Sequence, residues 1–354
     1  CKKTSNNAIN LRSGRCRRGE TKISNFSQLQ GPAGTNGSNG ADGTDGADGS
    51  LRVFGDGSAG ALEVSSSTSF IEENPQFTDV HIASGVTLNV DSGTVIRCTG
   101  SFLNEGTIIV DQYASGTYVG SSSSSAYAPP MASAGFGITR AAGSVGAFGT
   151  NSGALAGGAG GVSINEFSAR QILRPGPLGG SGGGVGLTGA GGSGGGTFTV
   201  LAAGSITNSG TILADGQGVS VGGAGGGGGI IILASQTQVT NSLSGTLSVQ
   251  GGDGGASFHS VGASGGGGGG FVHLISPSTP INAGAVDYSG GDAGSNGAVG
   301  AVSTSPRLGG AGGGSCYGAG GMGSSVSSAG TSSGNTGGVV GALLTTTADP
   351  ASLM

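Results

Sequence analysis

Three segments decide the fold, because each repeats one pattern of residues. They read GGGTFTVLAAGSITNSGTIL at 194–213, GGGGGIIILASQTQVTNSLSGTLSV at 225–249 and GGGGGGFVHLISPSTPINAGAVDY at 265–288. In each segment a glycine run precedes a short apolar string, and an Asn and then a Gly precede a second string. The matching asparagines lie 33 and 41 positions apart, at Asn208, Asn241 and Asn282. Self-similarity at this period predicts a solenoid in which successive repeats stack.

Glycine dominates the composition of the whole chain. Of 354 residues 84 are Gly, none is Trp and 9% are charged. Ordinary soluble domains contain about 7% Gly and roughly a quarter charged residues. Without a period such a composition would indicate disorder, since glycine loses the most backbone entropy on folding. Because apolar strings recur between the glycines, we expect ordered structure over residues 51–300.

Two structures compete for glycine runs such as 225–229 and 265–270. They are either tight turns, for which glycine accepts positive φ, or polyglycine strands in a polyproline-II-like bundle. In the bundle, the missing side chains let each backbone bond to neighbours on several sides. In both cases the glycine is architectural. We also expect the repeated asparagines to stack as an amide ladder inside the solenoid.

Residues 51–112 predict a first β unit with short alternating strings bounded by turn residues. The string LNEGTI at 103–108 matches ITNSGTI at 206–212, so the repeat begins before the glycine-rich zone. The Gly-Asp-Gly turn at 55–57 and the strings after it resemble a recurrent glycine-rich β-helix module of bacterial surface and phage tail proteins. The resemblance covers roughly 51–297 and implies a structural module rather than a particular activity.

Residues 31–50 carry glycine at every third position from Gly31 to Gly49. This segment resembles the collagen-like stalks of bacterial and phage surface fibres. Only glycine fits where three polyproline-like chains meet at one axis, so the pattern predicts a homotrimer. A flexible glycine-rich linker is the alternative. The predicted fold class is therefore all-β, a glycine-rich parallel β-solenoid or β-helix, with polyglycine-II packing as one option, preceded by a short collagen-like segment.

The chain begins Cys1-Lys2-Lys3-Thr4-Ser5-Asn6-Asn7, which resembles the start of a mature bacterial lipoprotein. The resemblance implies that Cys1 is lipidated, that residues 1–30 form a polar tether, and that the protein lies on the extracellular face of the outer membrane or on the cell surface. An unlipidated chain that happens to begin at Cys is the alternative. Setting Cys1 aside, the sequence leaves the pairing of Cys16, Cys98 and Cys316 open.

Two regions are candidates for contact with a ligand. Residues 113–192 interrupt the repeat with a Ser/Gly/Tyr-rich insertion, which predicts loops projecting from one face or a cap over the coil. Exposed tyrosines among Ser and Gly are typical of adaptable recognition surfaces. Between two glycine runs of the 193–297 repeats, Phe258 and His259 predict a loop tip. The candidate contact residues are Tyr113, Tyr118, Tyr127, Phe258 and His259. Residues 298–354 predict a Gly/Ser-rich cap, tip or frayed tail.

Catalytic and metal-binding patterns are not evident in the sequence. No lysine follows Lys22, so a phosphate-binding Gly-Lys-Ser/Thr motif is excluded. His81 and His273 lie within strand-like strings and are interpreted as strand side chains. The pair Glu72-Glu73 is interpreted as a solvated turn rather than a glycosidase dyad. We therefore expect no cofactor and no metal.

Charge also excludes one class of partner. From residue 26 onward six arginines face seventeen acidic side chains, which disfavours nucleic acid. We expect a non-enzymatic cell-surface fibre or adhesin that presents loop tips to a surface glycan or protein receptor. A phage tail fibre receptor-binding protein and a self-assembling extracellular filament subunit are the alternatives, and a carbohydrate-active β-helix enzyme is a more distant one.

Overall fold

The computed structural model describes residues 1–3, 15–22, 53–70, 76–112, 191–257, 262–296, 309–315, 318–326 and 332–353. The chain divides into two compact units, Cys1–Ala47 and Asp48–Met354. In the first unit β1 (Lys2–Lys3) pairs antiparallel with β2 (Glu20–Thr21). A disulfide joins Cys1 to Cys16 in the same unit. The predicted collagen-like segment, residues 31–50, lies outside the described residues.

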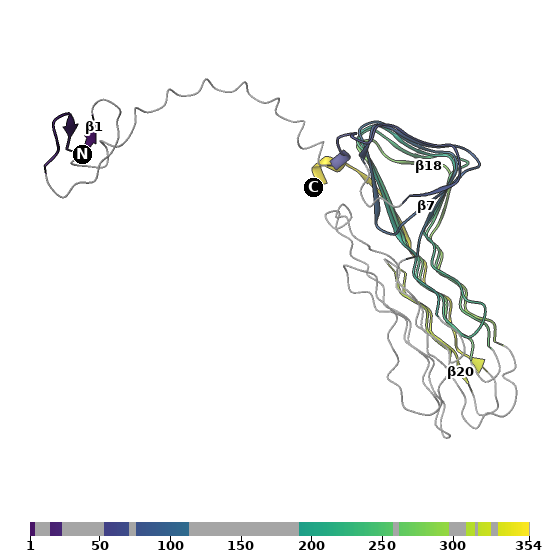
Figure 1. Cartoon of the computed structure of the whole chain (residues 1–354). Coiled ribbons are helices and arrows are strands. Elements are labelled where there is room, and N and C mark those ends of the chain that lie inside the picture. Colours follow the sequence, from purple (N-terminus) through teal and green to yellow (C-terminus); the bar gives the residue numbers. More distant parts are fainter. Residues whose placement is uncertain are drawn as a thin grey trace. The chain divides into compact units, whose positions relative to one another are not determined.

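Three parallel six-stranded sheets form the body of the second unit (Figure 1). Sheet S1 contains β3 (Leu62–Val64), β6 (Val80–Ile82), β9 (Phe102–Asn104), β12 (Ile206–Asn208), β15 (Val239–Asn241) and β18 (Ile281–Asn282). Sheet S2 contains β4 (Thr68–Phe70), β7 (Thr87–Val90), β10 (Thr107–Val110), β13 (Thr211–Leu213), β16 (Thr246–Ser248) and β19 (Ala285–Asp287). Sheet S3 contains β5 (Gln76–Phe77), β8 (Thr94–Cys98), β11 (Thr197–Ala202), β14 (Ile230–Ser235), β17 (Phe271–Ser276) and β22 (Ala342–Thr347).

Successive strands visit S1, S2 and S3 in turn, so each set of three strands is one coil of a parallel β-solenoid. The predicted all-β solenoid is confirmed. The repeat also continues past residue 297, because β22 supplies the sixth strand of S3. Sequence reasoning missed β4 and β5, since neither Thr68–Phe70 nor Gln76–Phe77 forms an apolar string.

The core is built from columns of apolar side chains that stack from coil to coil. In S2 one such column is in register and fully buried, and it consists of Leu88, Ile108, Ile212 and Leu247. Strands of S1 and S2 alternate between buried and partly exposed residues, as expected for sheets with one face on the core. Each buried aliphatic side chain contributes about 1.5 to 3 kcal/mol relative to exposure.

Sheet S3 differs because its four inner strands are buried on both faces. Every residue of β8, β11, β14 and β17 is buried. The inward residues, such as Val200 and Leu233, belong to the solenoid core. The outward residues form a second apolar cluster, in which Ile232 and Phe271 pack with Phe54 and Leu353. Continuous apolar strings are typical of such doubly covered parallel strands, which explains why these strings stood out in the sequence.

Glycine-rich chain leaves the body between S2 and S3 in the later coils, and Figure 1 shows it extending from one corner of the sheets. We call its described part the glycine bundle, defined as residues 191–196, 214–229, 249–257, 262–270, 288–296, 309–315, 318–326 and 334–341. Near its far end lies a short antiparallel pair, β20 (Ser325–Val326) and β21 (Ser332–Ser333). Of the predicted insertion at 113–192, residues 113–190 lie outside the described residues, and residues 191–192 belong to the bundle.

The central strand of the bundle, residues 262–270, donates backbone hydrogen bonds with a period of three. One face bonds residues 249–255 through Ser264 N to Gly255 O (3.0 Å), Gly267 N to Gly252 O (2.8 Å) and Gly270 N to Val249 O (2.7 Å). A second face bonds residues 310–313 through Gly265 and Gly268, each 2.9 Å from its acceptor. A third face bonds residues 336–339 through Gly266 and Gly269. Three residues per turn is the period of a polyproline-II-like helix, not of a β-strand.

Glycine is required in this bundle because neighbouring backbones lie where a side chain would begin. A Cβ built on Gly267 would overlap the carbonyl oxygen of Gly226, and one on Gly291 would overlap that of Gly252. The turn interpretation is wrong for the described runs, since no glycine of 225–229 or 265–270 has a positive φ. These glycines supply bare backbone to a hydrogen-bonded bundle.

Substitution of Gly267 by Ala tests this constraint. We expect Gly267→Ala to destabilise the protein by about 2 kcal/mol or more, because the new methyl group forces packed backbones apart. Gly218→Ala is the matched control, since Gly218 is exposed and its nearest neighbour to a built Cβ is 3.1 Å away. Thermal denaturation of both variants makes the comparison, and equal melting temperatures would contradict a steric role for Gly267.

The predicted asparagine ladder is confirmed along the interior of S1. Asn104, Asn208 and Asn241 are fully buried. Each Nδ2 donates to the Oδ1 of the next rung at 2.8 Å, from Asn104 to Asn208, from Asn208 to Asn241 and from Asn241 to Asn282. Each of the three donating amides also lies 3.3 Å from a backbone carbonyl of the following coil, at Thr211, Thr246 and Ala285. The ladder thereby satisfies polar groups that would otherwise be costly to bury.

Removal of a middle rung is expected to be far more costly than removal of the last one. Asn208→Ala leaves the Oδ1 of Asn241 without its donor and the Nδ2 of Asn104 without its best acceptor, at a cost of about 2 to 4 kcal/mol. Asn282→Ala is the control, because Asn282 is exposed and its loss affects one buried neighbour. Urea denaturation measures the unfolding midpoint of both variants. Similar midpoints would show that the middle rung of the ladder does not contribute more to stability than the last one.

Candidate functional site

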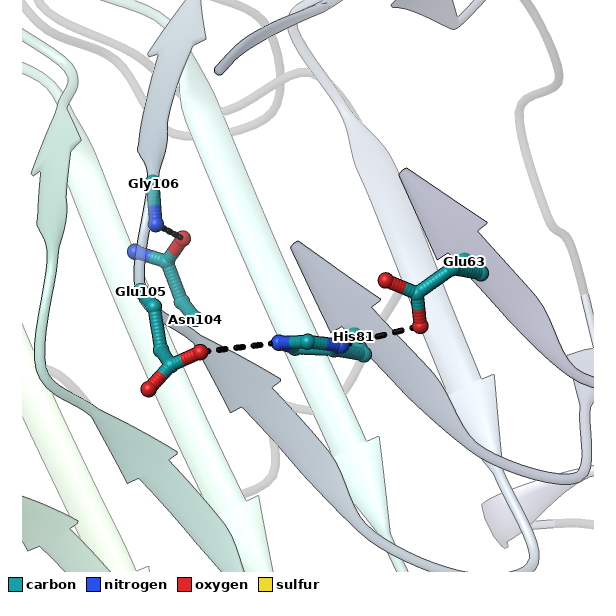
Figure 2. A network of polar contacts seen from close by, with 5 residues as sticks. All are labelled: Glu63, His81, Asn104, Glu105 and Gly106. Atoms are coloured by element: carbon teal, nitrogen blue, oxygen red, sulfur yellow. Dashed lines mark hydrogen bonds and ion pairs between the residues drawn. The ribbon is translucent and has the colours of Figure 1, made fainter. Parts of the chain in front are cut away.

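A polar cluster on the outer face of S1 joins three coils through one imidazole. His81 on β6 lies between Glu63 on β3 and Glu105, which follows β9 (Figure 2). Its Nδ1 is 2.8 Å from Glu63 Oε2, and its Nε2 is 2.9 Å from Glu105 Oε2. All three side chains are partly exposed. Asn104 turns inward beside this cluster and accepts a 3.2 Å hydrogen bond from Gly106 N, so the turn between β9 and β10 contributes to both core and surface.

The two carboxylates favour the protonated imidazole. They raise the pKa of His81 above its ordinary 6.5, the hydrogen bond with Glu105 first and that with Glu63 second. When charged, the imidazole donates through both nitrogens, one to each carboxylate. Because the folded-state pKa is raised, the resulting stability is fully present below pH 6.5 and is lost as the pH rises through the folded-state value. The effect is screened by solvent, since the ion pairs are exposed.

The geometry of this cluster suits a cross-link between coils better than a catalytic site. Both nitrogens of His81 face a carboxylate, so neither is directed at a hydroxyl or thiol nucleophile as in a catalytic triad. Glu63 and Glu105 contact opposite sides of the ring and do not converge on a common point. Within the part of the chain that the structure describes, no group of three or more His, Cys, Asp or Glu side chains is placed to hold a metal ion.

His273 on β17 is the second described histidine, and it is buried in S3. Its Nε2 lies 2.7 Å from Thr346 Oγ1 on β22, and its ring packs 5.6 Å from that of Phe271. Burial lowers the pKa of His273 to about 4, so the imidazole is neutral at physiological pH. The interpretation of His273 and His81 as strand side chains is confirmed, although the carboxylate partners of His81 were not foreseen.

Two other described groups have raised pKa values, the partly buried Asp215 and the buried Cys98. Asp215 follows β13, and burial raises the pKa of its carboxyl, which accepts hydrogen bonds from Ser248 Oγ (2.6 Å) and Gln250 N (2.7 Å). Burial raises the pKa of the Cys98 thiol to about 12, so this cysteine is an unreactive core residue at neutral pH. Burial accounts for the raised pKa of both groups.

The residues predicted to contact a ligand cannot be placed. Tyr113, Tyr118 and Tyr127 lie outside the described residues, and so do Phe258 and His259. The chain leaves the described bundle after Ser257 and returns at Gly262.

The cysteine predicted to carry a lipid is found in a disulfide. The bond between Cys1 and Cys16 occupies the sulfur that a thioether-linked lipid would need. The disulfide and the lipid are thus alternative states of one atom. Sequence reasoning did not consider this pairing, because it set Cys1 aside. Cys316 lies outside the described residues.

Sequence reasoning missed the Glu63–His81–Glu105 cluster because its members are 18 and 24 positions apart. The signal was present in the coil spacing, since Leu62, Val80 and Phe102 stack in register and place Glu63 beside His81. The sequence shows that the three residues share a face only when the number of residues in each coil is known.

Comparison with known proteins does not assign the chain to a family. No protein-family model matches the chain, and no curated protein or solved structure matches it either. No helix in the described part of the chain is long and apolar enough to cross a membrane.

The titration of His81 is expected to depend on both carboxylates. Glu105→Gln and Glu63→Gln should each lower the pKa of His81, and Glu105→Gln should lower it more because its hydrogen bond has the larger effect. NMR titration of the imidazole measures the shift in each variant. An unchanged His81 pKa in both variants would show that the contacts are not formed in solution.

Proposed function

We propose that this protein is a non-enzymatic fibre or adhesin of a bacterial cell surface. In this proposal the three-sheet solenoid is a rigid base and the glycine bundle is a projecting arm. The chain reversals at the far end of the arm present side chains to a surface glycan or a protein receptor. A collagen-like stalk at 31–50 would join three such chains, and a lipid on Cys1 would hold them at the outer face of the membrane.

The observation that carries the proposal is the backbone hydrogen bonding of the bundle. Residues 262–270 bond to neighbouring chain on three sides, and all nine of them are buried. We interpret this lattice as polyglycine-II packing, which makes the arm rigid without a side-chain core. A rigid arm holds its chain reversals in a defined position. Such pre-organisation favours binding of a partner, whereas a spacer does not need it. One reversal is the Val221–Gly222 turn, where Gly222 has a φ of 70°.

Two further features support a binding role over an enzymatic one. Structural surroundings account for the shifted pKa values of described ionisable groups such as His81, which is raised by its two carboxylate partners, and Asp215, which is raised by burial. The acidic, lysine-free body disfavours nucleic acid as a partner.

A phage tail fibre receptor-binding protein is the second candidate, favoured by the Cys1–Cys16 disulfide. In that disulfide Cys1 cannot carry a thioether lipid, and a phage fibre needs none. Mass spectrometry of the intact protein purified from its native source separates the two, because three acyl chains add mass at Cys1 and a disulfide removes two hydrogens.

A whole-cell and glycan-array binding assay with the full chain tests the proposed function. We expect Phe258→Ser combined with His259→Ser to weaken binding about tenfold or more, as loss of aromatic contact residues commonly does. Leu243→Ser is the control, since Leu243 is 86% exposed in the turn between β15 and β16. Absence of binding by the wild-type chain to every cell type and glycan, or equal binding by the two variants, would contradict the role proposed for Phe258 and His259.

A further inference from the structure

One buried side chain on the outer side of S3 has a polar atom without a partner. His273 lies in the middle of β17 and is 1% exposed. Its Nε2 lies 2.7 Å from Thr346 Oγ1, whereas its Nδ1 has no hydrogen-bond partner among the described residues. A buried polar atom left unpaired is costly, so such atoms are uncommon in folded proteins. The position of His273 therefore needs an explanation.

His273 faces the apolar cluster on the outer side of S3. Phe271 and Ile275, which lie two positions before and after it on β17, belong to that cluster, and alternate residues of a strand point to the same side. The ring of Phe271 packs 5.6 Å from the imidazole. On the neighbouring strands the residues opposite His273 are Ile232 of β14 and Leu344 of β22. These neighbours are apolar, so they cannot stabilise a positive charge on the ring.

The charged groups on this side of S3 do not compensate for a charge on His273. Among the described residues of the elements packed there, these groups are Asp56, Arg97 and Asp349, which belong to the 53–60 segment, to β8 and to the turn before a 3₁₀ helix, η2 (Pro350–Leu353). The two carboxylates accept backbone hydrogen bonds within their own turns. Burial is the only cause of the lowered pKa of His273. The imidazole therefore has no described carboxylate to pair with.

The strand that bonds to His273 belongs to a segment with little burial of its own. We call residues 342–353, which comprise β22 and η2, the C-terminal segment. β22 pairs with β17 along its length, and Ala351 and Leu353 pack against the outer cluster of S3. Within the C-terminal segment only Pro350 is buried, whereas every residue of β17 is buried. Elements with few buried apolar contacts open at the lowest cost, so this segment can separate while β17 stays in place.

We propose that protonation of His273 releases the C-terminal segment from β17, so that the last coil opens in acid. The charged imidazole carries a proton on both nitrogens, and the Nδ1 proton would have no acceptor among the described residues. A buried charge without a partner is far more costly than the same charge in water. When Leu344 and Thr346 move away from the ring, water can hydrate it. The inference does not depend on the proposed adhesin function.

The direction and range of the pH dependence follow from the burial of His273. In the docked state, with the segment against β17, burial lowers the pKa of His273 from 6.5 to about 4. Because the docked-state pKa is the lower one, docking is fully stable above pH 6.5 and loses stability as the pH falls toward 4. Between pH 8 and pH 5 the ratio of released to docked segment should rise roughly 30-fold. His81 has the opposite dependence, because its two carboxylates raise its pKa.

Hydrogen exchange of the full chain, followed by mass spectrometry at pH 8 and pH 5, tests the proposal. After correction for the pH dependence of intrinsic exchange, we expect the amides of β22 to exchange roughly 30-fold faster at pH 5 and those of β14 to keep their protection. His273→Gln should remove this acceleration, because the glutamine amide can still bond to Thr346 but takes up no proton. His81→Gln is the matched control, since His81 is the other described histidine, and it should retain the acceleration of the wild type.

Equal corrected exchange of β22 at the two pH values would overturn the proposal. Equal loss of protection in β14 would also overturn it, because the whole unit would then unfold rather than one segment, and so would an unaltered response of His273→Gln. His273→Leu is a second uncharged variant for use if His273→Gln does not fold, and it should lose the response as well. NMR titration of the wild-type imidazole needs no variant, and a His273 pKa at or above 6.5 would contradict the proposal.

Discussion

Backbone-to-backbone hydrogen bonding at distances that exclude a side chain is the constraint on which this structure depends. The buried apolar side chains of the glycine bundle are mostly small, such as those of Ala224, Ala263 and Ala311. Hydrogen bonds on three sides of the central strand, residues 262–270, therefore hold the bundle together. A single Cβ at positions such as Gly267 or Gly291 would occupy the place of a carbonyl oxygen. Glycine has a high entropic cost of ordering. In the bundle that cost is offset by backbone hydrogen bonds. A residue with a side chain could not form them, because its Cβ would overlap the neighbouring backbone.

The body of the solenoid provides the template from which the bundle grows. The four inner strands of S3 are buried on both faces, and two of them, β14 and β17, begin where the returning glycine strands end, at Ile230 and Phe271. The asparagine ladder in S1 holds successive coils in one register, because each amide needs the next at a matching height. A ladder on one sheet and apolar columns on the others therefore align the glycine strands before they leave the body.

Polar groups that resemble an active site have structural explanations in this protein. His81 links three coils through Glu63 and Glu105, while His273 is kept neutral within the core. Among the described residues, neither histidine therefore points to a catalytic centre.

The sequence by itself determined the all-β repeat, most strand positions in 193–297 and the asparagine ladder. It did so because the apolar strings of S3 and the repeated Asn-x-Gly or Asn-x-x-x-Gly step are local patterns within one repeat. Sequence alone did not distinguish turns from extended strands in the glycine runs, since glycine permits both conformations. Hydrogen bonds between residues as distant as Gly225 and Gly265, or Gly268 and Gly313, decided that question.

The grouping of Glu63, His81 and Glu105 and the pairing of Cys1 with Cys16 also became visible only in the folded chain. Coil lengths in this solenoid vary, so a residue's neighbours on the next coil follow from strand register rather than from a fixed spacing. The position of β22 (Ala342–Thr347) in S3 is likewise a tertiary property. Nothing in the string Ala342–Thr347 distinguishes a strand paired on both sides from one that ends a sheet, and only the order of strands in S3 places it at the edge.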